Sequence, residues 1–314
     1  MRSIIFLSLF LPLPLALTAQ FAPAAGQPGS TAIEAESISF AGWASGVVVS
    51  RGLQDVTQPD LGLTSAGLTE NALGFPDNNT VSLGDGGSAV LTFDFPLEDH
   101  PGYDFAVFEN SFNDHFLELA FVEVSSNGTD FVRFPATSLT QTETPVGGFG
   151  SVDPTQIDNF AGKYRAGYGV PFDLAQLQDS TQLDLQSITH IRIVDAVGTL
   201  DPEFATYDHL GNLVNEIYPT PFETGGFDLD AVGIIEQLST SRSAQAETFR
   251  VFPNPVASGQ SIRLPGYEGQ TLRLIGTTGL RYELPIHGTS VPITLPAGVY
   301  TGQVGEAIFR LLVL

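Results

Sequence analysis

The sequence predicts an all-β protein, built mainly from a jelly-roll-like antiparallel sandwich, and three observations support that class. Phe, Gly and Pro are abundant, with 23, 33 and 21 copies in 314 residues. Apolar residues occur in short alternating runs that end at turn-forming residues, which is the pattern of strands in a sandwich or jelly roll. Long stretches with the 3.6-residue period of an amphipathic helix are missing.

The first 19 residues have the layout of a cleavable secretory signal. Arg2 supplies a positive charge, an apolar run covers Ile4–Leu17, and the small residues Thr18 and Ala19 precede Gln20. The apolar run is shorter than the roughly 20 residues that a helix needs to span a bilayer, and no later segment suits that role. We therefore expect an exported protein, extracellular or on the outer cell surface.

The body, residues 20–237, contains five well-marked candidate strands. Turn sequences such as Asn127-Gly128 separate them. A short helix is predicted at Leu174–Leu177, with Asp173 as its N-cap. The candidate strands are Ala89–Phe95, Asp104–Glu109, Leu119–Ser125, His190–Asp195 and Phe227–Ile235.

A linker rich in Ser, Thr, Ala and Gln is predicted at residues 238–247. The remaining residues, 248–314, have the strand pattern of a second, smaller β unit, an immunoglobulin-like sandwich close to the lower size limit for independent folding. Its candidate strands are Ser261–Leu264, Thr271–Gly276, Pro292–Leu295, Gly298–Val304 and Ala307–Val313.

The charge is distributed unevenly between these two parts. Residues 20–245 carry 6 Lys and Arg against 31 Asp and Glu, a net charge of −25, whereas residues 246–314 carry 5 Arg against 4 Glu. So acidic a body repels nucleic acid and suits divalent cations. A solvated acidic surface in a salt-tolerant protein is the alternative explanation. Because the chain has no cysteine, disulfides and a lipid anchor on cysteine are excluded.

The C-terminal part contains four short motifs in a fixed order. They are Phe252-Pro-Asn-Pro255, Leu274-Ile-Gly-Thr-Thr-Gly279, Leu295-Pro-Ala-Gly-Val-Tyr300 and Arg310-Leu-Leu-Val-Leu314. With these motifs the C-terminal part resembles the sorting domain of the type IX secretion system of Bacteroidota. The chain departs from the usual pattern at Arg281-Tyr282, and also at Arg310, where lysine is commoner. The resemblance implies export through the outer membrane by that machinery; a small immunoglobulin-like module is the alternative.

Seven segments of the body follow one another in a recognisable order. They are Asn71–Gly74, Pro76-Asp77, Ser82–Ser88, Asp104–Asn110, Phe121–Ser126, Ala161–Tyr164 and Gly225–Gly233. With these segments the body resembles bacterial extracellular surface proteins of uncertain function, with discoidin-like and carbohydrate-binding jelly rolls as more distant relatives. This resemblance implies a fold more firmly than a ligand.

Acidic residues in these segments predict a calcium site. Residues two apart in a strand share a face, so Asp228 and Asp230 are expected to point one way while Phe227, Leu229 and Ala231 point into the core. Carboxylate and amide oxygens suit calcium better than zinc or copper. The candidate ligands are Asp104, Glu109, Asn110, Asp228 and Asp230.

Three functions remain open for the body. The first is non-catalytic binding or adhesion, supported by calcium, in which aromatic side chains stack on a glycan. The second is a glycoside hydrolase that uses paired carboxylates, and the third is a structural matrix protein without a small ligand. The candidate stacking residues are Trp43, Tyr103, Tyr164 and Tyr168, and the candidate hydrolase residues are Glu109, Glu118, Glu123, Asp195 and Asp228.

Non-catalytic binding is favoured because other catalytic signatures are missing from the sequence. It contains no Gly-x-Ser-x-Gly elbow, no His-Glu-x-x-His and no phosphate-binding loop. Arg192 lies on an apolar strand and is expected to pair with Asp195 or Glu123 as a structural ion pair. The expected partners are the secretion machinery and an extracellular glycan.

Overall fold

A computed structural model describes residues 20–37, 39–235, 251–276, 280–305 and 307–314. The described structure is essentially all-β, with 36% strand and 5% helix, and the named strand pairs in the body are antiparallel. The all-β prediction is therefore confirmed. The predicted signal, residues 1–19, and the predicted linker, residues 238–247, lie outside the described residues.

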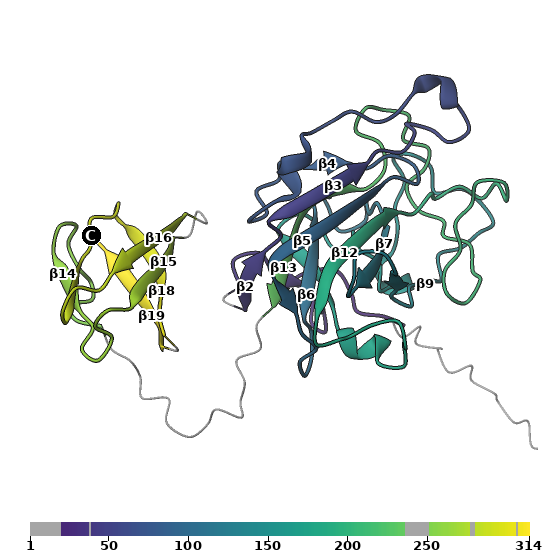
Figure 1. The fold of residues 1–314 in the computed structure, drawn as a ribbon. Coiled ribbons are helices and arrows are strands. Elements are labelled where there is room, and N and C mark those ends of the chain that lie inside the picture. The colour runs from purple at the N-terminus through teal and green to yellow at the C-terminus, as the bar shows by residue number, and fades with distance from the viewer. Residues whose placement is uncertain (1–19, 38, 236–250, 277–279, 306) are drawn as a thin grey trace, which may run out of the picture.

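The body contains two large antiparallel sheets (Figure 1). The first has the order β1-β11-β6-β13-β2, with β4 also paired to β13, and the second has the order β3-β5-β12-β7-β8. In the first sheet the strands are β1 (Ile33–Glu34), β2 (Phe40–Trp43), β4 (Val81–Ser82), β6 (Phe105–Glu109), β11 (Tyr168–Phe172) and β13 (Asp228–Ile235). In the second they are β3 (Gly46–Ser50), β5 (Ser88–Leu97), β7 (Ala120–Ser125), β8 (Val132–Arg133) and β12 (Ile188–Asp195).

The remaining elements of the body are short. Strands β9 (Thr137–Ser138) and β10 (Ile157–Asp158) pair with each other. Four 3-10 turns are η1 (Pro59–Leu61), η2 (Thr69–Ala72), η3 (Pro154–Gln156) and η4 (Leu174–Leu177). The predicted short helix is η4, and its predicted cap is present because the Asp173 carboxylate accepts the Ala175 N–H.

Successive long strands alternate between the two sheets: β5, β7 and β12 lie in one, and β6, β11 and β13 in the other. The β4–β5, β6–β7 and β12–β13 connections therefore meet at one end of the sandwich, which we call the loop end. The antiparallel registers agree, since Glu109 lies opposite Leu229 and Asp195 lies opposite Ala120. The β5–β6 and β11–β12 connections lie at the opposite end.

The main core fills the space between the sheets, and β6 shows how the sequence builds it. Phe105 and Val107 point into this core, whereas Ala106 and Phe108 point into a smaller apolar cluster on the outer face of their sheet. Both faces of β6 are covered, so its five residues are all buried. This explains why the strand reads as a continuous apolar run rather than as an alternation.

The described C-terminal residues form two sheets with their own apolar core. One pairs β14 with β17, and the other has the order β16-β15-β18-β19. Four strands agree closely with the predicted ones, β17 lies earlier than predicted, and β16 was not predicted. The strands are β14 (Ser261–Arg263), β15 (Thr271–Gly276), β16 (Arg281–Pro285), β17 (Ser290–Pro292), β18 (Gly298–Val304) and β19 (Ala307–Val313).

Candidate functional site

Six carboxylates converge at the loop end, and we call them the loop-end acidic cluster. They come from the ends of strands in both sheets and from the connections between them: Glu109 ends β6, Asp195 ends β12 and Asp228 begins β13. Glu118 lies just before β7. The six members are Asp85, Glu109, Glu118, Asp195, Glu216 and Asp228.

Burial opposes ionisation throughout this cluster, because a charged carboxylate loses its hydration. It raises the pKa of Asp85 and Asp195 to about 7 and that of Asp228 to about 6. It also raises the pKa of Glu109, Glu118 and Glu216 well above the usual value. Repulsion by neighbouring carboxylates adds to the shift at each of these residues except Asp228.

Backbone amides orient several members of the cluster. The two carboxylate oxygens of Asp195 accept the N–H groups of Phe227 at 2.8 Å and Gly86 at 2.9 Å. Glu109 accepts the N–H of Ser111 at 2.8 Å. Backbone N–H groups therefore donate to Asp195 and Glu109, and the remaining lone pairs of these two carboxylates stay available.

Glu118 differs from these residues. The residue is 7% exposed, no residue that the structure describes forms a hydrogen bond to its carboxylate, and its oxygens are not among the fully buried unpartnered atoms. Four further carboxylates repel it: Glu109, Asp228, Asp195 and Asp85.

Glu123, which lies five residues later in the chain, is a useful contrast. It is 5% exposed, but it accepts the Arg133 Nε–H at 2.8 Å and also pairs with Arg192. The predicted partner of Arg192 is thus confirmed as Glu123 rather than Asp195. Glu123 is neutralised by two guanidinium groups and takes no part in the cluster.

The positive charge of Arg51 acts on Asp228 and partly offsets the rise in pKa that burial causes there. Its guanidinium also donates to three backbone carbonyls, those of Ala66, Gly67 and Ser82, at 2.6–2.8 Å. One guanidinium tied to carbonyl groups cannot balance six carboxylates.

Two glycines allow the chain to approach the acids closely. A Cβ at Gly226 would lie 2.8 Å from an oxygen of Asp195, and one at Gly198 would lie 2.3 Å from an oxygen of Glu216. Larger residues would occupy the space that the carboxylates use.

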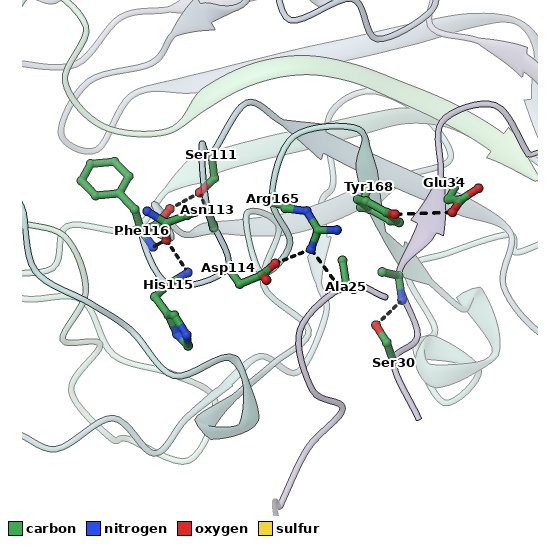
Figure 2. A network of polar contacts seen from close by, with 11 residues as sticks. Ala25, Ser30, Glu34, Ser111, Asn113, Asp114, His115, Phe116, Arg165 and Tyr168 are labelled. Atoms are coloured by element: carbon green, nitrogen blue, oxygen red, sulfur yellow. Dashed lines mark hydrogen bonds and ion pairs between the residues drawn. The ribbon is translucent and has the colours of Figure 1, made fainter. Parts of the chain in front are cut away.

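The β6–β7 loop, which carries Glu118, is held by a polar network (Figure 2). Arg165 pairs with Asp114 at 2.5 Å and donates to the Ala25 carbonyl at 2.9 Å. Its guanidinium also lies 4.6 Å from the centre of the Tyr168 ring. Figure 2 shows Arg165 between the loop and Tyr168. Tyr168 was predicted to stack on a glycan, but its ring is already in contact with the Arg165 guanidinium.

Asp104 lies at the opposite end of the sandwich from Glu109. Five residues of strand span roughly 16 Å, whereas two ligands of one calcium ion lie within about 5 Å of each other; the two predicted ligands therefore cannot share an ion. Asp104 instead lies with Asp99 and Asp173, whose carboxylate oxygens are within 4.8 Å of one another. Backbone N–H groups bond to both Asp104 oxygens.

A β-bulge between Leu229 and Ala231 changes the predicted faces of β13. Leu229 packs in the main core, but Ala231 packs in the outer cluster, so the prediction that both point into one core is wrong. The extra residue in the bulge is Asp230, whose oxygens accept the N–H groups of Asp77 and Asn78 at 3.1 Å. Asp228 instead accepts the Ser82 hydroxyl.

The other predicted site residues are engaged within the fold. Asn110 donates to the Thr80 hydroxyl at 3.3 Å. Tyr164 is 1% exposed, so it is inaccessible to a glycan. Trp43 and Tyr103 are partly buried against the outer apolar cluster.

Exposed aromatic side chains at the loop end were not predicted. Phe112, Phe149 and Phe222 are 73%, 81% and 46% exposed. The Phe149 and Phe222 ring centres lie 6.2 Å apart. Their sequence signal is a phenylalanine among turn-forming residues, as in Gly147-Gly-Phe-Gly150, which lacks the alternation of a strand.

No protein-family model and no curated protein matches this chain. Among the residues that the structure describes, no helix is long and apolar enough to cross a membrane.

Proposed function

We propose that the protein is a non-catalytic binding protein of the cell exterior, whose loop end contacts an extracellular polymer, with a glycan as the first candidate. The observation that carries this proposal is the group of exposed phenylalanines at the loop end. Exposed aromatic rings that lie together offer an apolar surface that sugar rings or polymer chains can cover.

The positions of Phe149 and Phe222 support one common binding surface, because their rings lie next to each other. Phe112 lies on the β6–β7 connection and Phe222 on the β12–β13 connection. Phe149 comes from a distant loop, but a Cβ at the preceding Gly148 would lie 2.1 Å from the Pro219 carbonyl oxygen. That close approach seats the Phe149 loop against the β12–β13 connection.

Four of the five carboxylates considered for a hydrolase, Glu109, Glu118, Asp195 and Asp228, do lie in one cluster. However, Glu109 and Asp195 are 2% and 4% exposed. A glycosidase must place its acid and its nucleophile or base against the scissile bond, and these two carboxyls expose little surface to a substrate. Binding is therefore favoured over hydrolysis.

The binding proposal is tested with a Phe149→Ser/Phe222→Ser double variant on a glycan array and on purified surface polysaccharide. We expect at least tenfold weaker binding than for the unaltered protein. Phe95→Ser is the matched control, because Phe95 is 50% exposed but lies towards the far end of β5 from the loop end. Equal binding by all three proteins would contradict the proposal, and release of reducing sugar would favour the hydrolase.

We further propose that residues 248–314 direct export by the type IX secretion machinery, on the strength of the ordered motifs quoted above. The test is a fluorescent protein with a secretory signal, fused to residues 248–314 and expressed in a Bacteroidota host that has this machinery. Fluorescence outside the outer membrane is expected, and the same reporter without the tail should stay in the periplasm. Periplasmic retention of both reporters would contradict the proposal.

A further inference from the structure

Three carboxylates meet at the end of the sandwich opposite the loop end. Asp99 and Asp104 come from the β5–β6 connection, and Asp173 lies between β11 and η4. One oxygen of each lies within 4.8 Å of the oxygens of the other two. Asp104 is 2% exposed, whereas Asp99 and Asp173 are half-buried. An ion from solution can therefore reach the group past these two residues.

Asp99 provides an independent observation. Its Oδ1 atom is fully buried, yet no residue that the structure describes forms a hydrogen bond to it. By contrast, the Asp104 oxygens accept the backbone N–H groups of His100 at 2.9 Å and Leu174 at 2.7 Å. A buried acceptor without a partner is costly. The buried oxygen of Asp99 has the environment of a ligand whose partner is a cation from solution.

The described part of the body does not balance the charge of this group. Burial raises the pKa of Asp104 to about 6, and repulsion by Asp99 and Asp173 adds to the shift. Burial also raises the pKa of Asp173, again with repulsion by Asp99. Each lysine and arginine that the structure describes in the body bonds to groups other than these three carboxylates. These cations are Arg51, Arg133, Lys163, Arg165 and Arg192.

We propose that Asp99, Asp104 and Asp173 bind a calcium ion. Carboxylate oxygens are the donors that hard cations prefer. Two ligands of one calcium ion lie within about 5 Å of each other, and the three oxygens meet that limit. Calcium accepts six to eight oxygens in irregular geometry, so water can fill the positions that face solvent. Magnesium needs shorter bonds and a near-regular octahedron, which ligands from two separate connections satisfy less readily.

Such an ion would join two connections at the end of the body where β13 finishes. The Asp104 N–H donates to the Phe172 carbonyl at 2.8 Å, and the Asp104 carbonyl accepts the Ile235 N–H at 2.8 Å. Ile235 is the last residue of β13, and the predicted linker follows shortly after it. The ion would therefore stabilise the region from which the chain continues into the C-terminal part. This site lies at the opposite end from the exposed phenylalanines, so it does not depend on the proposed polymer binding.

The experiment uses the purified protein after treatment with a chelator and desalting, at neutral pH and constant ionic strength. Isothermal titration with calcium is expected to show saturable binding with a dissociation constant of about 0.1–1 mM, the range of extracellular calcium modules. At a free calcium concentration about tenfold above that constant, the melting temperature of the body should rise by about 3–6 °C. Magnesium at the same concentration should give a smaller rise.

Two variants locate the ion. Asp99→Asn removes a charge without removing a hydrogen bond formed by the described residues, so without calcium it should melt at a higher temperature than the unaltered protein. Asp173→Asn keeps the η4 cap, because asparagine accepts the Ala175 N–H as well as aspartate does. Each variant should bind calcium at least tenfold more weakly and lose at least about two thirds of the calcium-induced rise in melting temperature.

Asp153→Asn is the matched control. Asp153 caps η3 as Asp173 caps η4, since its carboxylate accepts the Thr155 N–H at 2.9 Å. It is exposed and is not a member of the three-carboxylate group. The control should keep the calcium affinity and the full rise in melting temperature of the unaltered protein.

Four results would overturn the proposal. The first is the absence of saturable heat and of a melting shift with calcium in the unaltered protein, a measurement that needs no variant to fold. The second is a full calcium response in both Asp99→Asn and Asp173→Asn, and the third is an equal loss of response in Asp153→Asn. The fourth is an equal rise with magnesium, which would overturn the choice of calcium. If calcium binds as expected but the phenylalanine variants bind polymer normally, the ion site stands and the proposed function fails.

Discussion

Gly162 and Gly167 form a matched pair that tests how tightly the chain packs against Glu118. Both have left-handed backbone conformations, with φ of +82° and +81°. A Cβ at Gly162 would lie 1.8 Å from the Glu118 carbonyl oxygen, whereas a Cβ at Gly167 would meet nothing within 4 Å. Substitution by alanine therefore imposes the same backbone strain at both positions but a steric clash at only one.

The expected magnitudes follow from these two contributions. A left-handed conformation costs a non-glycine residue about 1–2 kcal/mol, and we expect Gly167→Ala to lose about that amount. Relief of the clash at Gly162 requires a backbone shift, which the paired hydrogen bonds between Ala120 and Ala161, at 2.9 and 3.1 Å, oppose. Overpacking of this kind costs about 1–3 kcal/mol, so Gly162→Ala should lose about 2–5 kcal/mol in total.

Equilibrium unfolding in urea measures both variants under identical conditions. Comparing the two alanine variants cancels most of the change in the entropy of the unfolded chain, which is common to them. Equal losses of stability would refute the reasoning, because the close approach of Gly162 to the Glu118 carbonyl would then have no energetic consequence. A greater loss at Gly167 would refute it as well.

Three further predictions concern the rest of the body. Lys163 is 2% exposed and burial lowers its pKa to about 8 from 10.5, so the protonated form destabilises the fold. This cost to the free energy of unfolding, about 3 kcal/mol, is present in full below pH 8 and disappears as the pH rises to 10.5. Urea unfolding should therefore show that the unaltered protein gains stability relative to Lys163→Met between pH 8 and pH 10.5. Glu123→Gln should cost about 1–2 kcal/mol in the same assay, since two partly exposed guanidinium groups lose a charged acceptor. Phe172→Ala should cost about 3–5 kcal/mol, because Phe172 is fully buried in the main core, whereas Phe149→Ala should change stability by less than about 0.5 kcal/mol.

Each of these expectations has a contrary outcome. A stability difference for Lys163→Met that stays constant from pH 8 to 10.5 would contradict the assigned titration. If Glu123→Gln is more stable than the unaltered protein, the ion pairs of Glu123 stabilise the fold by less than the desolvation of its carboxylate costs. Similar losses for the two phenylalanine variants would contradict their assigned burial.

The strands that were predicted could be read from the sequence because they have a clear local pattern, whereas β3 and β11 were not predicted. The alternating run predicted at residues 190–195 and the turn at Asn127-Gly128 need only neighbouring residues to define them. The capped turn at Leu174–Leu177 was equally local. The bulge at Asp230 was not predicted, because one extra residue is accommodated by the register against β6 and β4, which the sequence of β13 does not specify.

The sequence by itself determined the all-β class, the positions of five strands of the body and the concentration of acidic residues there, since these depend on composition and on a two-residue period. Only the tertiary structure decided which acids meet. The β6–β7 loop with Glu109 and Glu118 lies far along the chain from Asp195 and Asp228, and the alternation of strands between two sheets brings all four to one end. The same alternation sends Asp104 to the other end and leaves Glu118, unlike Glu123, without an arginine. Long-range pairing controls these outcomes, and no local pattern encodes it.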